Sequence, residues 1–194
     1  MLTVSETAEA LRSFDNVLIL THVRPDGDTV GCAAALCAGL RALGKTAYLL
    51  PNPELTKNSE PYFLPYAAPE GFVPGAVVST DVATTALLPE NARCYVGAID
   101  LAIDHHPSFE HFGKANIVRP EAAACGELIY DIMAALGPIT PELALPLYVA
   151  VGIAVVCAGI VAAVLISRQL QNTQAQTQKQ KDEKSAYHRK KGGK

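Results

Sequence analysis

A short apolar run, followed by a polar loop and a helical segment, is the feature that most constrains the fold of this chain. Residues 17–20 form a continuous apolar run of the kind found in buried parallel strands. Residues 21–28 are mostly polar, and apolar side chains then recur at helical spacing between residues 30 and 43. We expect Asp28 to cap this helix at its N-terminus and Gly44 to end it.

A second strand at residues 46–50 would complete a βαβ unit, from which parallel α/β sheets are built. Further segments extend the pattern, with strands expected at residues 76–80, 98–103 and 116–118, helices at 3–14 and 123–136, and a long loop at 51–74. The sequence therefore predicts an α/β fold with a parallel sheet and flanking helices.

Acidic and histidine side chains follow three of the predicted strands. They are His22, Asp26 and Asp28 after the first strand, Asp81 after residues 76–80, and Asp104, His105 and His106 after residues 98–103. Carboxyl ends of parallel strands meet in one crevice, so these groups should converge. Mixed oxygen and nitrogen ligands suit a divalent transition metal such as manganese, and a bridging carboxylate would allow a two-metal site for phosphoryl transfer. Taken singly, His22 could be an ordinary loop histidine and Asp28 only a helix cap.

Several spaced motifs resemble the DHH phosphoesterase family. The segment THVRPDGDTVG is similar to its first motif, VSTDVA to its second and AIDHHPSFEHFG to its third, and RPEAAACGELIYDIM resembles the run into the helix that follows. Within the family the likeness is to the bacterial oligoribonuclease/pAp-phosphatase group, relatives of RecJ. The resemblance covers residues 1–151 and implies a DHH phosphoesterase domain there.

The resemblance also implies two manganese ions and their ligands. His22 and Asp26 would hold one ion, Asp28 and His105 the other, and Asp81 would bridge the two.

It further implies catalytic roles for Asp81, Asp104 and His106. Asp104 and His106 would orient the ligands and the phosphate, with His106 facing the substrate. The reaction would be hydrolysis of short oligoribonucleotides or pAp-like nucleotides by hydroxide generated at the metal ions.

The chain departs from the family pattern where a fourth motif, Asp-Thr-Gly, is expected. Residues 147–151 are followed by Gly-Ile-Ala-Val without a carboxylate, and the C-terminal substrate-binding domain of the family is not recognised. We therefore expect a weak second metal site and impaired activity. Two alternatives stay open: a non-catalytic remnant, truncated or membrane-tethered, and a membrane-bound cyclic-dinucleotide phosphodiesterase.

Residues 147–166 contain no charged residue, and their 20 positions are about the length of a membrane span. Because residues 141–151 also resemble a helix of the soluble domain, we interpret only residues 152–167 as an apolar C-terminal helix and a candidate transmembrane segment. An accidental origin of the segment is a further alternative. Residues 168–194 hold eight Lys and Arg against two acidic residues, so this basic tail has a charge of +6, whereas the whole chain has a net charge of −3. We expect the tail to be disordered.

The five cysteines form no Cys-x-x-Cys pair, which favours reduced thiols in the cytoplasm. Residues 1–13 lack the apolar run of a secretory signal, and we therefore expect a cytoplasmic domain, with membrane association through the C-terminal helix as an open alternative. We expect Cys125 to be a small buried side chain and not a nucleophile, and His111 to be an exposed loop residue.

Overall fold

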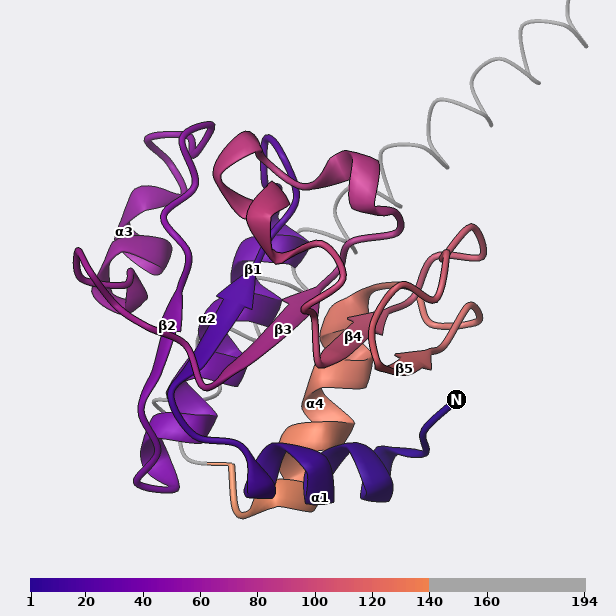
Figure 1. Ribbon diagram of the computed structural model, residues 1–194. Coiled ribbons are helices and arrows are strands. Elements are labelled where there is room, and N and C mark those ends of the chain that lie inside the picture. The colour runs from indigo at the N-terminus through magenta and orange to yellow at the C-terminus, as the bar shows by residue number, and fades with distance from the viewer. Residues whose placement is uncertain (140–194) are drawn as a thin grey trace, which may run out of the picture. The chain divides into compact units, whose positions relative to one another are not determined.

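All strands of the sheet run parallel, as the βαβ pattern predicts. The computed structural model of the protein describes residues 1–139. Its five strands are β1 (Val17–Leu20), β2 (Ala47–Leu49), β3 (Ala76–Thr80), β4 (Leu101–Asp104) and β5 (Ala115–Val118). They lie side by side in the order β2-β1-β3-β4-β5 (Figure 1).

This strand order creates a switch point between β1 and β3. The chain moves from β1 outward to β2, then returns past β1 to β3 and continues outward in the opposite direction to β4 and β5. Connections that diverge in this way leave a crevice at the carboxyl ends of the two central strands, where ligands bind in open α/β sheets. The polar loops after β1, β3 and β4 therefore open at one edge of the sheet.

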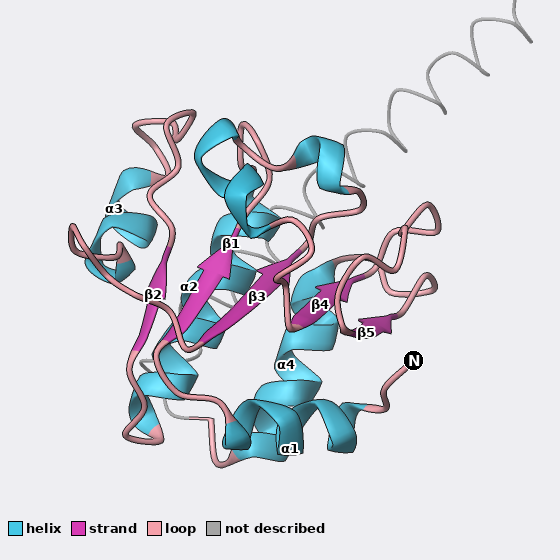
Figure 2. Cartoon of the chain, in the orientation of Figure 1, coloured by secondary structure: helices cyan, strands magenta, loops and turns pink. Residues whose placement is uncertain are grey.

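Three helices cover one face of the sheet, as Figure 2 shows: α1 (Val4–Ser13), α2 (Gly27–Ala42) and α4 (Cys125–Leu136). Helix α1 begins with a capping box between Thr3 and Glu6, and α4 packs against both α1 and α2. A Cβ at Gly39 of α2 would overlap the Met133 side chain of α4, so glycine allows these helices to approach closely. The larger apolar core lies between these helices and the sheet.

The short helix α3 (Glu60–Phe63) and the 3-10 helix η1 (Leu64–Tyr66) contact α2, and Phe63 and Tyr66 pack in or against the larger core. The 3-10 helices η2 (Thr85–Leu87) and η3 (Glu90–Tyr95), with the loops around them, cover the opposite face. A smaller core on this face includes Leu18 and Leu20 of β1, while Val17 and Ile19 face the larger core. This alternation shows β1 buried on both sides, as its unbroken apolar run predicts.

The structure corrects two expectations. The strand expected at residues 98–103 begins only at Leu101 and includes Asp104, and a turn at residues 96–98, where Gly97 has φ 84°, occupies the expected start. Helix α2 is capped by Asp26, whose Oδ1 accepts the Thr29 N–H at 3.1 Å, and not by Asp28. The Asp28 side chain is instead bonded to α4.

Within residues 1–139, no helix is both long enough and apolar enough to cross a membrane. The apolar segment at residues 147–166 and the basic tail at residues 168–194 lie outside the described residues. Their interpretation as a span and a disordered tail stays a prediction.

Candidate metal centre

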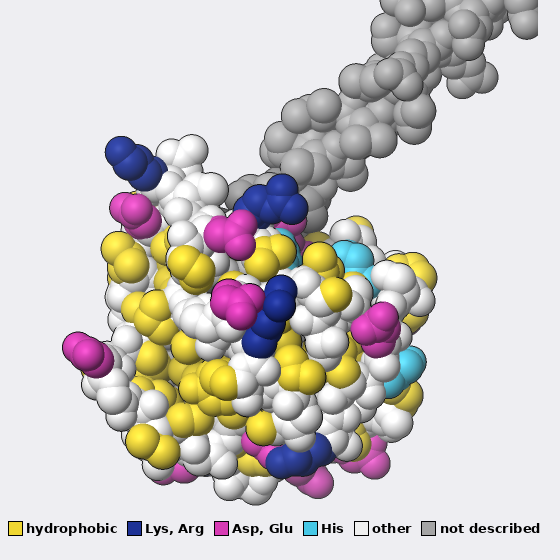
Figure 3. Space-filling view, turned by 45° about the horizontal axis from the view of Figure 1, so that its top comes forward, with side chains coloured by type: hydrophobic (Ala, Val, Ile, Leu, Met, Phe, Trp, Pro, Cys, Tyr) yellow, Lys and Arg dark blue, Asp and Glu magenta, His cyan; other side chains and the backbone are white. Residues whose placement is uncertain are grey.

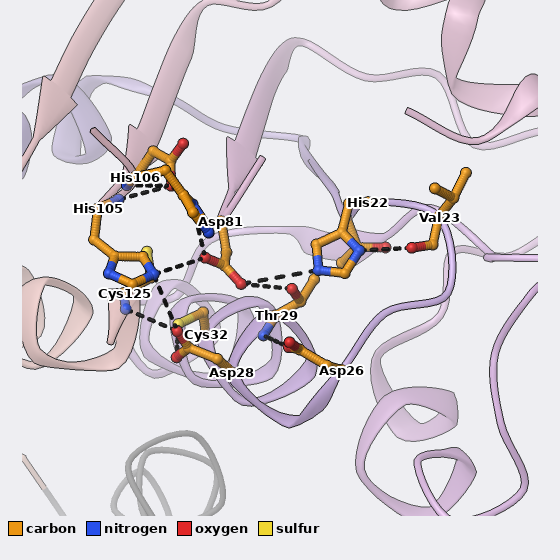
Figure 4. A network of polar contacts seen from close by, with 12 residues as sticks. His22, Val23, Asp26, Asp28, Thr29, Cys32, Asp81, His105, His106 and Cys125 are labelled. Atoms are coloured by element: carbon orange, nitrogen blue, oxygen red, sulfur yellow. Dashed lines mark hydrogen bonds and ion pairs between the residues drawn. The ribbon is translucent and has the colours of Figure 1, made fainter. Parts of the chain in front are cut away.

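The carboxyl ends of three strands bring the predicted site residues into one cluster. His22 lies in the loop after β1, Asp81 directly after β3, and His105 and His106 directly after β4. In Figure 4, Asp81 lies between His22 on one side and His105 and His106 on the other. The N-terminus of α2 contributes its N-cap Asp26 and, from its first turn, Asp28, both below this row of side chains.

Asp81 is the central residue of the cluster, and its side chain is only 4% exposed. Its backbone φ is 58°, in the left-handed region that residues other than glycine rarely adopt. Thr29 Oγ1 donates a hydrogen bond to Asp81 Oδ2 at 2.6 Å, whereas the buried Oδ1 has no hydrogen-bond partner. Since buried polar atoms are normally satisfied, this oxygen is available to a cation.

Three imidazole rings surround the Asp81 carboxylate. The Asp81 oxygens lie 4.0 Å from Nε2 of His22, 3.6 Å from Nε2 of His105 and 3.8 Å from Nδ1 of His106. These separations are too long for hydrogen bonds, so the groups face one another across a small gap.

Backbone carbonyls fix the orientation of two of these rings. His22 Nδ1 lies 2.6 Å from the carbonyl oxygen of Val23, and His105 Nδ1 lies 3.1 Å from that of Ala122. A carbonyl can only accept, so each Nδ1 carries the proton and each Nε2 keeps its lone pair toward Asp81. Metal-binding histidines are held in this way in many proteins.

The electrostatics of the cluster also favour a cation. Burial, and then the nearby carboxylate of Asp28, raise the pKa of Asp81 to about 6, although the hydrogen bond from Thr29 opposes the shift. Asp26 adds a further negative charge. A bound cation would relieve this repulsion and favour the ionised carboxylate.

On one side of Asp81 lie His22 and the exposed Asp26. One ligand atom from each of His22, Asp26 and Asp81 lies within 4.8 Å of the others. This is the group that the sequence predicts for the first ion together with its bridging carboxylate.

On the other side, Asp81, His105 and His106 form a second such group. The sequence predicts Asp28 here, and Asp28 Oδ2 does lie 3.8 Å from His105 Nε2. However, Asp28 Oδ2 accepts the N–H of Cys125 at 2.8 Å and Oδ1 accepts that of Gly126 at 3.0 Å. Asp28 thus satisfies the N-terminus of α4, whose own N-cap residue, Ala124, has no polar side chain.

Asp104 is fully buried and organises the turn that carries the two histidines. Its Oδ1 accepts the backbone N–H groups of His105 at 2.6 Å and His106 at 3.2 Å, and Nδ1 of His106 at 2.7 Å. Burial opposes protonation of the His106 ring, but the bond to Asp104 and the nearby carboxylates outweigh it and raise its pKa. Asp104 therefore contacts the histidines, as expected of a residue that orients ligands.

The residues present fit a site for divalent ions. Both three-residue groups contain Asp81, and they combine carboxylate oxygens with imidazole nitrogens. Asp81 Oδ1 and Asp104 Oδ2 are buried without hydrogen-bond partners. A carboxylate common to two ligand groups is the arrangement that a two-ion site requires.

Sequence reasoning missed several supporting contacts. Thr29 holds Asp81, and Asn52 Nδ2 donates to the Thr21 hydroxyl at 3.0 Å and the His22 carbonyl at 2.8 Å. Asn52 follows β2, so the rule that polar residues gather at strand ends could have found it. The backbone N–H groups of α4 that bind Asp28 could not be found from the sequence, because any residue type supplies such a group.

The thiols near the site are structural, as expected of Cys125. Cys32 donates to Asp28 Oδ1 at 3.3 Å, and both thiols are completely buried. Contact with Cys32 lowers the pKa of Cys125, but burial and the nearby carboxylates outweigh it and raise the pKa to about 11. A thiol that is neutral at physiological pH is a poor nucleophile. His111 is exposed, as expected.

Sequence comparison places these features in a known family. Residues 16–153 match the model of the DHH family, N-terminal domain. The chain is 34% identical over 143 residues to the bifunctional oligoribonuclease and PAP phosphatase NrnA of Thermus thermophilus, which covers 72% of this chain and 43% of that protein. The chain thus spans less than half the length of this relative.

Solved structures share the fold. An exopolyphosphatase-related protein from Bacteroides fragilis superposes with a TM-score of 0.62 at 20% identity, covering 78% of this chain and 49% of that chain. The exonuclease RecJ bound to manganese superposes with a TM-score of 0.50 at 15% identity, covering 77% and 42%. With a family match over more than half of its length, the chain belongs to the DHH family.

Proposed function

We propose that this domain is a manganese-dependent phosphoesterase that hydrolyses short oligoribonucleotides or pAp-like nucleotides. The DHH match and the name of the Thermus relative support the reaction class and the substrates. The manganese in the RecJ structure supports the choice of metal. In this chain the same fold presents carboxylates and imidazoles at the switch point of the sheet.

The observation that carries the proposal is the shared position of Asp81. Its buried carboxylate belongs to both three-residue ligand groups and keeps one oxygen free of hydrogen bonds. A purely structural carboxylate at this depth would be satisfied by protein donors.

We assign His22, Asp26 and Asp81 to one ion, and Asp28, His105 and Asp81 to the other. When bound, the ions would lower the pKa of a water molecule and neutralise charge on the phosphate oxygens. The carbonyls of Val23 and Ala122 keep Nε2 of His22 and His105 available, and Asp104 holds the His105–His106 turn. The bond from His106 to Asp104 leaves this ring suited to orienting a substrate phosphate.

A non-catalytic domain that holds a single ion is the second candidate, and one observation favours it. Both oxygens of Asp28 already accept backbone N–H groups, which leaves them weaker ligands. Residues 147–155 offer no further carboxylate for that ion. Counting bound manganese separates the candidates, since two ions per chain support the phosphoesterase, one ion supports the alternative, and none contradicts both.

Hydrolysis of pAp and of a diribonucleotide in the presence of manganese tests the proposal. We expect phosphate or mononucleotide release that is lost in Asp81→Ala and His105→Ala. Glu90→Gln, which changes an exposed carboxylate on η3, serves as the matched control and should retain activity. Activity that survives both site substitutions would overturn the assignment.

A further inference from the structure

A cavity of about 430 Å³ opens directly onto the candidate metal centre. Its lining consists of His22, Val23, Arg24, Asp81, Leu87 and His106. The volume is in the range of small-molecule sites. Figure 3 shows histidine, acidic and basic side chains close together on the upper part of the surface that faces forward in that view. Arg24 is the one Lys or Arg that lines the cavity within the described residues.

Arg24 differs from the other arginines of the described part of the chain. Arg12 and Arg41 donate to backbone carbonyls, and Arg119 donates to Asp131 at 2.6 Å. Arg93 lies 3.2 Å from Glu90. The Arg24 side chain is 83% exposed and forms a 4.0 Å ion pair with Glu54, a separation too long for a hydrogen bond, so its donors are available to a ligand.

The backbone holds Arg24 at the rim of the cavity. Its φ is 48°, in the left-handed region that is unfavourable for a residue with a long side chain. The adjacent Val23 N–H donates to the Leu87 carbonyl of η2 at 2.8 Å, and the Val23 carbonyl accepts from His22. The bonds that orient the His22 ring therefore also fix the loop that carries Arg24. Such strained positions cluster at ligand sites.

Charge balance indicates what Arg24 can bind. The cavity floor is acidic, so bound ions would be needed to hold the phosphate that is hydrolysed. A second phosphate on the same substrate would lie beyond the ions and would be repelled by Glu54 and the site carboxylates. A guanidinium group matches phosphate geometry with two parallel hydrogen bonds and is always charged.

We propose that Arg24 binds a substrate phosphate other than the one that is hydrolysed, so that the site selects nucleotides with two or more phosphates. This inference rests on the proposed function and deepens it. Glu54 holds the guanidinium loosely at the rim until a phosphate replaces it. Arg24 is thus a specificity-determining residue.

Two measurements on the full chain test this role. The first is calorimetric binding of adenosine 3′,5′-bisphosphate, with calcium as the divalent ion. The second is manganese-dependent hydrolysis of p-nitrophenyl phosphate, whose single phosphate must occupy the reacting position. Variants are Arg24→Ala and Arg24→Lys, with Arg93→Ala as a matched control because Arg93 is also an exposed arginine paired with a glutamate.

We expect Arg24→Ala to weaken bisphosphate binding about tenfold and to change kcat/KM for p-nitrophenyl phosphate less than about twofold. Arg24→Lys should recover part of the binding, and Arg93→Ala should match the wild type. Unchanged bisphosphate binding in Arg24→Ala, or an equal loss for both probes, overturns the inference alone. A wild type that binds the bisphosphate but, with manganese, hydrolyses neither the bisphosphate nor p-nitrophenyl phosphate overturns the proposed function, while the Arg24 effect on binding can still hold. A wild type that does not bind bisphosphate overturns both.

Discussion

The two sides of Asp81 are built in different ways, although each presents a carboxylate and an imidazole. On the loop side, which His22 and Asp26 form, Asp26 is exposed, and one of its oxygens accepts the N–H of Thr29. On the helix side, which Asp28 and His105 form, Asp28 is buried, and its two oxygens accept two backbone N–H groups of α4. In the proposed metal centre, the loop side would therefore bind a cation through the second Asp26 oxygen while the cap of α2 is kept, whereas on the helix side ligand binding would compete with the bonds that stabilise α4.

This difference teaches that a ligand residue can also be a structural one. Asp28 joins α2 to α4 across nearly 100 positions of sequence, and through His105 it also faces Asp81. If Asp28 and Asp26 bind the proposed ions, a substitution at Asp28 should affect folding and metal binding together, whereas one at Asp26 should affect mainly metal binding. The predictions below test this contrast, from the largest effect to the smallest.

Replacing Asp81, the residue shared by the two sides, should weaken both proposed metal sites and abolish hydrolysis. We expect Asp81→Ala to lower manganese-dependent hydrolysis of pAp at least about 100-fold, because both ions lose a ligand at once. Initial rates at saturating manganese check this. His22→Ala should weaken manganese binding on the loop side alone, so a loss of both binding events in this variant would argue against the division of the ligands into two sides.

Substitutions of the two aspartates should separate folding from binding. Asp28→Asn should lower the free energy of unfolding by about 2–3 kcal/mol, because an amide cannot accept both buried N–H groups of α4. Asp26→Asn should cost less than about 1 kcal/mol, since asparagine also caps helices well. Urea denaturation without metal measures both values. Equal losses would contradict the difference between the two sides.

The pH dependence of stability provides a third test. The pKa of Asp81 in the folded protein, about 6, exceeds its ordinary value of 3.8, so the folded state binds this proton more tightly than the unfolded state. The resulting stability is complete below pH 4 and is lost as the pH rises through about 6; the raised pKa of His106 acts in the same direction. Without metal, unfolding between pH 4.5 and 7.5 should show a loss of roughly 1–3 kcal/mol from Asp81. Manganese should reverse this trend because it binds the ionised carboxylate.

The smallest effect is expected at Thr29. Thr29→Val keeps the shape of the side chain but removes the 2.6 Å hydrogen bond to Asp81 Oδ2. Because that bond stabilises the ionised carboxylate, manganese affinity should fall by about 1 kcal/mol, a few-fold in the dissociation constant. Manganese titration near neutral pH checks this, and an increase in affinity would show that the bond competes with the metal.

Most of the fold follows from sequence periodicity, because β1 is an unbroken apolar run, β3 opens with three apolar residues and α4 shows clear helical spacing. The start of β4 is an exception, since Ile99 is buried in the smaller core and extends the apolar pattern ahead of the strand that begins at Leu101. Burial alone does not distinguish a strand residue from a buried turn residue.

The convergence of His22, Asp81 and His105 follows from strand-end topology, which a sequence pattern can indicate. The role of Asp28 does not, because its partners are backbone N–H groups of Cys125 and Gly126, and any residue type supplies those. The capping of α4 by a side chain of α2 depends on how the two helices pack, and local helix propensity does not encode this packing.

A manganese titration of the wild type and of Asp81→Asn tests the central claim, that one carboxylate serves both sides, most directly. The wild type should bind two ions with unequal affinity, the tighter one on the loop side, where Asp26 is free of competing backbone bonds on one oxygen. Asp81→Asn should weaken both binding events more than about tenfold. If Asp81→Asn weakens only one event, or if the wild type binds a single ion, Asp81 is not shared between two ions.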